Sequence, residues 1–401
     1  ISAFVLWPFQ TVMAETKQGE LATFMKQVWR SNPVIEEANA RVLAAQAEKR
    51  AASRWQYNPE IEYEEEDVDG EDKTRVFGIS QTIDWNGKAR SSGTVAQFEL
   101  DAVTAERDEV RQNVTVEVLS ALAEHKVAQN VLSLSVQRTE LMKKFVDLAE
   151  KGLKAGDIDR GEFNLAQLAF SESLIGQAEA EVTVSDTRQN LEPSIGFIWK
   201  ALPTLPETLP KISEAYEEGG LIMALPSIRI LDNLEKAAKA AITQASRNRL
   251  PDPTLGIQGG QDAGADMIGF SVSLPLNIFN SYKAEVDVAK NEAIAVAKAR
   301  QTALHSARSR LNASHRNYVL SKKAWESWRG MGAQALEEQT ATLDRKFKVR
   351  ELNATDYLVQ VQQALDTEQA SQELYGKAWK SWFAWLAASG RAEQWVRDLG
   401  E

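Results

Sequence analysis

Long stretches of the chain alternate apolar, alanine and charged positions in the manner of amphipathic helices. Residues 34–56 are rich in alanine and charge and contain no glycine or proline, which predicts a helix. Residues 88–152 continue without a proline, and a further helix is expected over 158–190, after Gly156. At 1.5 Å per residue, a helix of about 65 residues measures roughly 95 Å. Such a helix must pack against others in a coiled-coil-like assembly.

The two halves of the chain carry the same order of features at a shift of roughly 193 residues. The second half predicts helices over 227–249, 282–345 and 354–388. In each half, the two shorter helices together approach the length of the long one, so they can lie end to end beside it. We therefore expect a first repeat over 15–190 and a second over 226–388. Matching positions include Asn32-Pro33 with Leu225-Pro226, Asn58-Pro59 with Asp252-Pro253, Gly78 with Gly269, and Leu153-Lys154-Ala155 with Phe347-Lys348-Val349.

The segment between the repeats, 191–225, loses the helical pattern. It contains Pro193, Pro203, Pro206, Pro210 and Gly219-Gly220. We expect a connector or a small irregular domain here. Near the C-terminus, Trp379, Trp382 and Trp385 fall on one helical face, and a packing stripe is favoured over a ligand site because aromatic residues mostly serve burial. Residues 389–401 form a C-terminal tail.

The first residues read as a targeting segment. Residues 3–13 are nearly all apolar, and Val12-Met13-Ala14 fits the small-residue rule for signal-peptidase cleavage. Residues 1–14 are therefore interpreted as the end of a secretory signal peptide, with a buried N-terminal strand as the alternative. No other stretch reaches 18 apolar residues, so no transmembrane helix is expected. Export without a helical anchor indicates the periplasm, the exterior or a β-barrel.

Two pairs of short strands are predicted, over 60–68 and 75–84 in the first repeat and over 254–262 and 267–275 in the second. Their alternation is typical of a strand with lipid on one side and a water-filled lumen on the other, although a half-buried strand of a soluble sheet shows the same pattern. The expected lipid-facing residues are Phe77, Ile79, Ile83, Ile268, Phe270 and Val272. The expected lumen-facing residues are Gly78, Ser80, Gly269, Ser271 and Ser273.

Four strands are too few to close a membrane barrel, because the smallest transmembrane barrels have about eight. Three copies of the chain would supply twelve strands. The predicted fold is mainly α with a small β part: a duplicated long-helix module that forms a homotrimeric α-barrel and a 12-stranded membrane β-barrel.

Composition excludes several kinds of chemistry. The chain has no cysteine, which rules out disulfides, catalytic thiols, Cys-ligated metals and a lipid anchor on Cys. The net charge of −11 argues against a nucleic-acid partner. The sequence contains no hydrolase, P-loop or dinucleotide motif, so we expect no enzyme activity and no cofactor.

The candidates for a metal site are weak. His125, His305 and His315 are scattered over long helices without chelating spacing. The acidic run Glu62–Asp67 and the following turn faintly resemble a calcium loop, but strands flank it and no closing Glu is present. A hydrated hairpin is the favoured interpretation. Glu62, Glu64 and Glu66 can also face a lumen and favour cations.

Together, these features resemble the TolC family of outer-membrane efflux proteins, and within it the CzcC/CusC-like heavy-metal branch. The resemblance covers about 30–388 of the sequence. The residues that carry it are Asn32-Pro33, Asn58-Pro59-Glu60, Asp84-Trp85-Asn86-Gly87-Lys88-Ala89-Arg90, Lys154-Ala155-Gly156-Asp157-Ile158, Leu250-Pro251-Asp252-Pro253, Leu274-Pro275-Leu276 and Phe279-Asn280.

The resemblance implies a passive exit channel of a tripartite pump in the Gram-negative outer membrane, with its helices in the periplasm. The implied partners are outer-membrane lipid, a periplasmic adaptor protein and an inner-membrane RND-type transporter. Adaptor docking is expected at two helical tips, formed by Lys154, Ala155 and Gly156 and by Lys348, Val349 and Arg350. Family members often carry glycine at both tips, whereas the second tip here carries Arg350.

Asp157 and Asp159 are the candidates for a pore gate, because a threefold axis would turn each into a ring of three carboxylates. The alternative is capping of helix 158–190, which is favoured for Asp157 and left open for Asp159. Export of heavy-metal cations is the leading function. A duct for drugs or other organic solutes is the alternative within the same fold, and a structural coiled-coil envelope protein is the alternative from another class.

Overall fold

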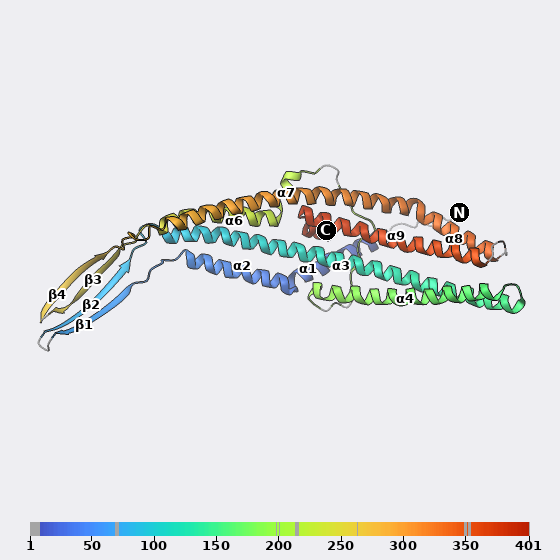
Figure 1. Ribbon diagram of the computed structural model, residues 1–401, viewed down its shortest axis with the longest axis horizontal. Helices are drawn as coiled ribbons and strands as arrows, with labels where there is room; N and C mark the ends of the chain where they lie inside the picture. Colours follow the sequence, from blue (N-terminus) through green and yellow to red (C-terminus); the bar gives the residue numbers. More distant parts are fainter. Residues whose placement is uncertain are drawn as a thin grey trace. The chain divides into compact units, whose positions relative to one another are not determined.

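The computed structural model describes residues 9–68, 72–197, 199, 201–212, 216–262, 264–348, 351 and 354–400. Its helices and strands alternate in the order expected of a duplicated module (Figure 1). The helices of the first half are α1 (Phe9–Ser31), α2 (Pro33–Ala52), α3 (Lys88–Ala155) and α4 (Arg160–Ile195). Those of the second half are α5 (Glu218–Ala224), α6 (Pro226–Asn248), α7 (Lys283–Ser327), α8 (Ala333–Lys348), α9 (Ala354–Ser389) and α10 (Ala392–Asp398).

The four strands form one antiparallel sheet in the order β1-β2-β3-β4. They are β1 (Glu60–Val68), β2 (Asp72–Thr82), β3 (Thr254–Asp262) and β4 (Ala265–Ser273). Two strands come from each half of the chain. The predicted fold class, mainly helical with a small sheet of four strands, is confirmed.

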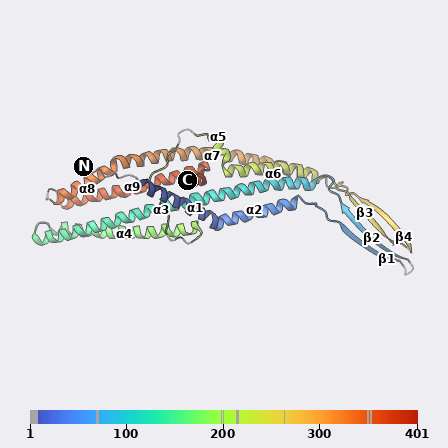
Figure 2. The same ribbon diagram turned by 180° about the vertical axis from the view of Figure 1, so that it is seen from behind.

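The chain divides into two compact units, and each takes segments from both repeats. Unit 1 consists of residues 1–36, 110–221 and 307–401, and unit 2 of 37–109 and 222–306. Unit 2 holds the sheet. Within unit 1, Figures 1 and 2 show α4 beside α3 and α8 beside α9. No helix in the described part of the chain is both long and apolar enough to cross a membrane.

One part of the core of unit 1 is an aromatic cluster. Trp379, Trp382 and Trp385 are buried, and the rings of Trp382 and Trp385 stack with centroids 5.0 Å apart. Trp395 closes the cluster against Trp379, at 6.2 Å. The packing stripe predicted from the spacing of these residues is confirmed.

Prolines open two helices at equivalent places. Pro33 is the first residue of α2, and Pro226 is the first residue of α6, where its missing N–H costs nothing. The buried Asn32 accepts a hydrogen bond from the Val34 N–H (2.9 Å) and donates one to the carbonyl of Ser194 (2.8 Å). The end of α4 therefore meets the residue that precedes α2.

The structure also departs from the expected elements. Residues 9–31 form α1, so the alternative of an N-terminal strand is wrong for this segment, and Val12-Met13-Ala14 lies within the helix. Helix α4 continues past Pro193 to Ile195, where Gly196 adopts a φ of 79° and ends it. Within the connector, 218–224 are helical.

The long helix expected over 282–345 is interrupted by a π-helical turn at Trp328–Gly332. The ring of Trp328 lies against Gly332, where a Cβ atom would collide with it. Single π turns widen a helix locally, and Gly332 makes room for the aromatic ring.

Candidate functional site

The sheet has one apolar face. A continuous row of apolar residues crosses all four strands, because Ile61 lies opposite Ile79, Ile79 opposite Ile257, and Ile257 opposite Phe270. The ring of Tyr63 packs on that of Phe77 at 4.7 Å between centroids. Residues expected to face lipid lie on this face and are exposed in the single chain: Phe77, Ile79, Ile268, Phe270 and Val272. Ile83 lies just beyond the end of β2 and is half-buried.

The opposite face is small, polar and acidic. Glu60 lies opposite Ser80, which faces Gly256 and then Ser271. In the next row, Glu62 lies opposite Gly78, followed by Gln258 and Gly269. The residues expected to face a lumen therefore share one face with Glu60, Glu62, Glu64 and Glu66 of β1. The segregation of faces matches the expected alternation, whereas the identity of what each face contacts remains a prediction.

The two outer strands leave hydrogen-bonding groups unused. Among the residues that the structure describes, β1 pairs only with β2 and β4 only with β3. The free N–H and C=O groups of a long edge strand with an apolar face can pair with a strand of another chain. Joining β1 of one copy to β4 of another extends the sheet and keeps its two faces separate.

A buried polar cluster joins the repeats where the strands meet the helices. The Nζ of Lys88 lies 2.9 Å from Oδ2 of Asp252, and both side chains are buried. Asn86 donates to Oδ1 of Asp252 at 3.0 Å, and the hydroxyl of Tyr57 donates to Oδ2 at 3.1 Å. The family motifs of the sequence include Asn86, Lys88 and Asp252, but sequence analysis missed the cluster, because no local spacing links Lys88 to a residue so far along the chain.

These contacts set the pKa of Asp252 in opposing ways. Burial raises the pKa, whereas hydrogen bonds from Lys88, Asn86 and Tyr57 and the charge of Lys88 lower it, and the lowering prevails. Asp84, on the neighbouring turn, accepts from the backbone N–H groups of Lys88 (2.7 Å) and Ala89 (2.9 Å) and so caps α3. The helix after β2 is thus fixed at its first turn.

The first tip ends α3 with a Schellman motif. The N–H of Asp157 bonds to the carbonyl of Gly152 (2.9 Å), and that of Gly156 to Leu153 (3.2 Å). Gly156 has a φ of 77°, a conformation that favours glycine. Lys154 pairs on the surface with Glu150 at 2.6 Å. Ala155 is the last residue of α3.

The capping residue of α4 is Asp159, which corrects the preference for Asp157. Its Oδ1 accepts from the Glu162 N–H (2.9 Å), and Glu162 accepts from the Asp159 N–H (3.2 Å), which completes a capping box. The helix therefore begins at Arg160, two residues later than expected, because this reciprocal pair satisfies its free N–H groups. Whether Asp157 or Asp159 lines a pore remains a prediction.

The second tip is described in part. Lys348 is the last residue of α8, whereas Val349 and Arg350 lie outside the described residues. The N–H of Glu351 bonds to the carbonyl of Lys346 at 2.9 Å, with the spacing of the Asp157–Gly152 bond at the first tip. Both tips thus contain a backbone hydrogen bond between residues five positions apart.

The helices that lead to the two tips share one hydrophobic cluster. Phe145 of α3 stacks on Tyr357 of α9 with centroids 5.9 Å apart. Buried members of the cluster are Met142, Phe145, Ala149, Ala166, Ala169, Leu343, Tyr357, Leu358 and Val361. The two hairpins are therefore packed against each other rather than independent.

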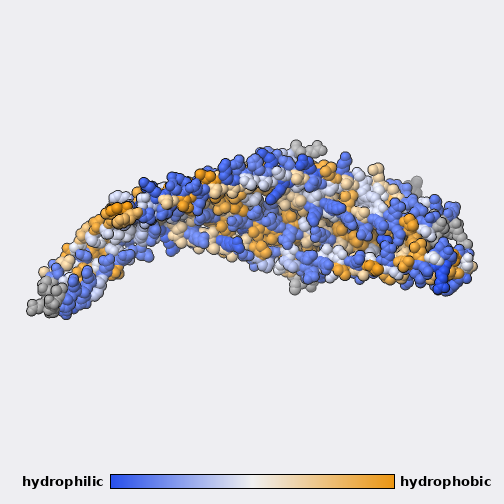
Figure 3. All heavy atoms as spheres, viewed as in Figure 1, coloured by the Kyte–Doolittle hydropathy of each residue, from blue (hydrophilic) through white to orange (hydrophobic). Residues whose placement is uncertain are grey.

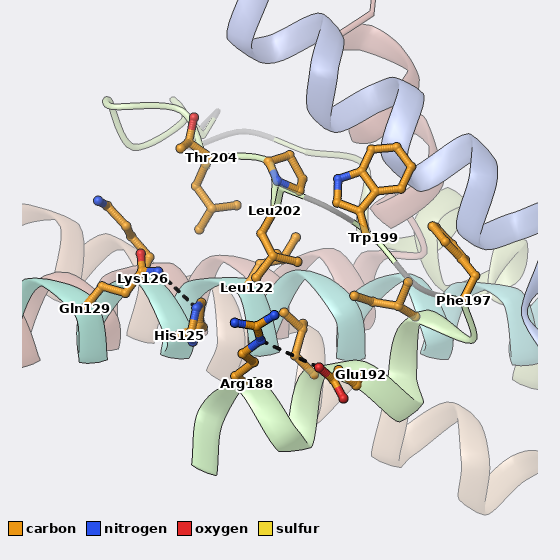
Figure 4. Close-up of a pocket in the computed structure, with 14 residues that line it drawn as sticks. Leu122, His125, Lys126, Gln129, Arg188, Glu192, Phe197, Trp199, Leu202 and Thr204 are labelled. Carbon is orange, nitrogen blue, oxygen red and sulfur yellow. Dashed lines mark hydrogen bonds and ion pairs between the residues drawn. The ribbon is translucent and has the colours of Figure 1, made fainter. Parts of the chain in front are cut away.

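A groove of about 670 Å³ lies between α3, α4 and the connector (Figure 4). His125 is buried at its floor, with Nδ1 3.0 Å from the Thr187 hydroxyl and Nε2 3.0 Å from the Gln129 amide. Burial, together with the charge of Arg188, lowers the pKa of His125. Arg188 in turn reaches Glu192 at 3.6 Å. His125 and Arg188 are therefore both engaged by neighbouring side chains.

No cluster of three or more His, Asp or Glu side chains able to hold a metal ion occurs in the described part of the chain. His315 instead packs its ring on Tyr216, with centroids 5.1 Å apart.

Residues 25–196 match the family described as "Outer membrane efflux protein". A curated relative, Protein CyaE of Bordetella pertussis, is 27% identical over 181 residues, which are 44% of this chain and 38% of that protein. The match thus spans well under half the length of that relative.

Solved structures are similar over nearly the whole chain. CusC has a TM-score of 0.79 at 14% identity, with 92% of this chain and 91% of that chain covered. The outer-membrane channel OprN has a TM-score of 0.78 at 17% identity, with 93% and 91% covered. The MtrE outer membrane channel of Neisseria gonorrhoeae has a TM-score of 0.77 at 18% identity, with 93% and 89% covered. Residues 25–196 thus carry the sequence pattern of the outer membrane efflux protein family, and nearly the whole chain has the fold of these channels.

Proposed function

We propose that this chain is the passive outer-membrane exit channel of a tripartite efflux pump. The observation that carries the proposal is the four-stranded sheet, which has an exposed apolar face, a small polar face and, among the described residues, an outer strand on each side that is paired along only one edge. A lipid-facing barrel requires these properties. The resemblance of the fold to outer-membrane channels supports the same conclusion.

In this proposal, three copies form the channel. Strand β4 of each copy pairs with β1 of the next, which closes twelve strands and leaves no edge. Phe77, Ile79, Ile83, Ile268, Phe270 and Val272 face lipid, and Gly78, Ser80, Gly269, Ser271 and Ser273 face the lumen. The helices extend into the periplasm of a Gram-negative cell as an α-barrel.

The helical tips are the proposed docking end. Lys154, Ala155 and Gly156 at the first tip, with Lys348, Val349 and Arg350 at the second, contact a periplasmic adaptor that links the channel to an inner-membrane RND-type transporter. The shared cluster around Phe145 and Tyr357 supports this assignment, because it holds the hairpins as one rigid platform.

Heavy-metal cations are the proposed cargo. The row Glu60, Glu62, Glu64 and Glu66 lies on the face that we assign to the lumen, and twelve such carboxylates in a trimer would favour cations. A duct for organic solutes of the same fold is the alternative. It predicts that replacing these glutamates with glutamine leaves transport unchanged.

The test begins with membrane fractionation of cells that express the full chain. We expect the protein in the outer-membrane fraction as a heat-modifiable trimer that conducts ions in planar bilayers. Recovery only as a water-extractable coiled coil without conductance would support the structural envelope protein instead. The cargo is tested by resistance of a channel-deficient strain to copper, zinc and cobalt against a panel of drugs.

A further inference from the structure

The groove between α3, α4 and the connector holds positive side chains beside an apolar wall (Figure 4). Its volume of about 670 Å³ lies within the range of small-molecule sites, and all of its lining belongs to unit 1. On the face of the helices drawn in Figure 3, apolar and charged residues are interspersed, so a single exposed apolar side chain does not mark a site there. The groove differs because it combines a cavity with an apolar wall and a charged one.

The connector supplies an aromatic wall that is already held in place. Phe197 and Trp199 meet edge to face, with ring centroids 5.5 Å apart. Trp199 also meets the ring of the buried Phe24 of α1, at 5.1 Å. Trp199 is still 36% exposed, so part of its surface is accessible. Figure 4 shows Trp199 and Leu202 on the connector across from Leu122 of α3. An apolar molecule can therefore enter the groove without first ordering its wall, which lowers the cost of binding.

Lys126 is a positive group of the groove that has no acidic partner among the residues that the structure describes. No acidic residue stands three or four positions from it on α3, where a helical ion pair would form. Glu124, two positions away, lies instead 3.8 Å from Lys380. Figure 4 shows Lys126 extending from α3 on the side of the connector. The ammonium group of Lys126 is therefore available to an anion in the groove.

Arg188 adds a second positive group that is only weakly bound. Its Nε lies 3.6 Å from Oε1 of Glu192, and the two side chains are 67% and 69% exposed. An ion pair this long and this exposed contributes little to stability. The guanidinium has further N–H donors, so it can bind another carboxylate beside that of Glu192. Since two cations oppose one carboxylate among the lining Lys, Arg and Glu side chains, the groove carries an excess of positive charge.

We propose that this groove binds an amphipathic organic anion, a carboxylate carried on an aromatic or aliphatic body. The carboxylate lies between Lys126 and Arg188, where charge-assisted hydrogen bonds hold it. The body packs on Trp199 and Leu202, which lose apolar surface to water when the groove is filled. A bound ligand thus links the connector to α3 and α4. The site is separate from the sheet and from the helical tips, so the inference goes beyond the proposed function and does not depend on it.

Equilibrium dialysis of the full chain in phosphatidylcholine nanodiscs tests the site, with empty nanodiscs as the reference. The probe is 1-naphthaleneacetate, which has both the carboxylate and a flat apolar body. Its neutral amide, 1-naphthaleneacetamide, keeps the body without the charge, and acetate keeps the charge without the body. We expect the amide to bind about tenfold more weakly than the acid, because it loses the charge-assisted hydrogen bonds. Acetate at the concentration of the probe should not displace it.

Matched variants assign the binding to the groove. Lys126→Gln should weaken binding of 1-naphthaleneacetate about tenfold and leave binding of the amide unchanged. Lys143→Gln removes an exposed lysine further along α3 and should change neither. Trp199→Leu should weaken the acid and the amide equally, because it shortens the apolar wall without touching the charges. Circular dichroism of each variant verifies that the helices are intact.

Three results would overturn the proposal. The first is the absence of saturable binding above the level of empty nanodiscs. The second is equal binding of the acid and the amide, which would leave no role for the cations. The third is an unchanged affinity in Lys126→Gln, or the same loss in Lys143→Gln as in Lys126→Gln.

Protection of a single thiol tests the position of the ligand independently. The chain has no cysteine, so Thr204→Cys at the exposed rim of the groove provides one site for a maleimide. Saturating 1-naphthaleneacetate should protect this thiol from labelling but leave Ser171→Cys, exposed elsewhere on α4, fully reactive. A thiol at 204 that does not react in the ligand-free protein would show that a second copy or another segment covers the groove, which also overturns the proposal. None of these measurements requires conductance, so failure of the ligand site and failure of the channel function are distinguishable.

Discussion

The carboxylate of Asp252 lies 2.9 Å from the Nζ of Lys88, and both side chains are almost completely buried. Lys88 begins α3 in the first repeat, whereas Asp252 precedes β3 in the second. The pair therefore joins the repeats at the base of the sheet. Burial of two charges costs several kcal/mol per ion, which their attraction and the hydrogen bonds from Asn86 and Tyr57 must offset. We infer that the pair fixes the position of the start of α3 relative to the start of β3, rather than adding net stability.

Removing one partner of this pair should be far worse than removing both. Asp252→Asn leaves the charge of Lys88 buried without a counterion, and we expect a loss of about 3–5 kcal/mol in the free energy of unfolding. The double variant Lys88→Met/Asp252→Leu should recover much of this loss, because apolar residues of similar volume often replace a buried ion pair without cost. Denaturant unfolding of the detergent-solubilised protein, followed by circular dichroism, measures both. Equal instability of the two variants would contradict this account.

The same carboxylate predicts how stability depends on acid. Because the pKa of Asp252 is lower in the folded chain than its ordinary value of about 3.9, its ionised form stabilises the fold above that value. The contribution disappears as the pH falls below about 3.9 and through the folded-state pKa. Unfolding midpoints should therefore fall more steeply below this pH in the wild type than in the double variant.

Local signals in the sequence predicted the strands better than the helix caps and the tertiary contacts between elements. The bounds of β1 and β3 agree with prediction, since turn-forming residues flank a clear alternation. The capping box Asp159–Glu162 was also present in the sequence, as an acidic residue three positions before Glu, but Asp157 competed for the same role. In contrast, the Lys88–Asp252 pair and the contact of Trp328 with Gly332 depend on tertiary packing that periodicity does not encode.

Arginine substitutions on adjacent residues of β4 should separate the two faces of the sheet. Phe270→Arg places a charge on the face assigned to lipid and should cost about 2–4 kcal/mol near the bilayer midplane, with loss of trimer. Ser271→Arg points to the other face and should preserve assembly while it changes conductance. Heat-modified gel mobility and single-channel recording measure the two effects. Equal tolerance of both substitutions would contradict the membrane assignment.

The role of Asp159 can be divided between its cap and its charge. Asp159→Ala removes both, and loss of the N-cap should cost about 1 kcal/mol. Asp159→Asn keeps a good N-cap but removes the charge, so its stability should resemble that of the wild type.

If a ring of three Asp159 carboxylates lines the mouth, hexaamminecobalt added on the periplasmic side should block the wild-type channel. Both variants should then lose this block, although only Asp159→Ala is destabilised. Block that persists in Asp159→Asn would leave the residue with capping alone, and Asp157→Asn would become the next variant to test.

Protonation of His125 should weaken the helical bundle in mild acid. Burial, and then the charge of Arg188, lower the pKa of the folded imidazole below its ordinary value of about 6.5. Below pH 6.5 the unfolded chain therefore binds a proton that the folded chain still excludes. Stability should be constant above this pH and should fall as the pH decreases toward the folded-state pKa, where the loss levels off.

His125→Gln tests this dependence, because an amide can still bond to Thr187 or Gln129 but does not titrate in this range. The difference between unfolding temperatures at pH 7.5 and pH 5 should shrink in this variant. His305→Gln is the matched control, since His305 is exposed on α7 and its removal should leave the difference unchanged. The other charged side chains that line the groove are Lys126, Arg188 and Glu192. If both histidine variants had an equal effect, the pH dependence would have to come from a titrating group outside the groove.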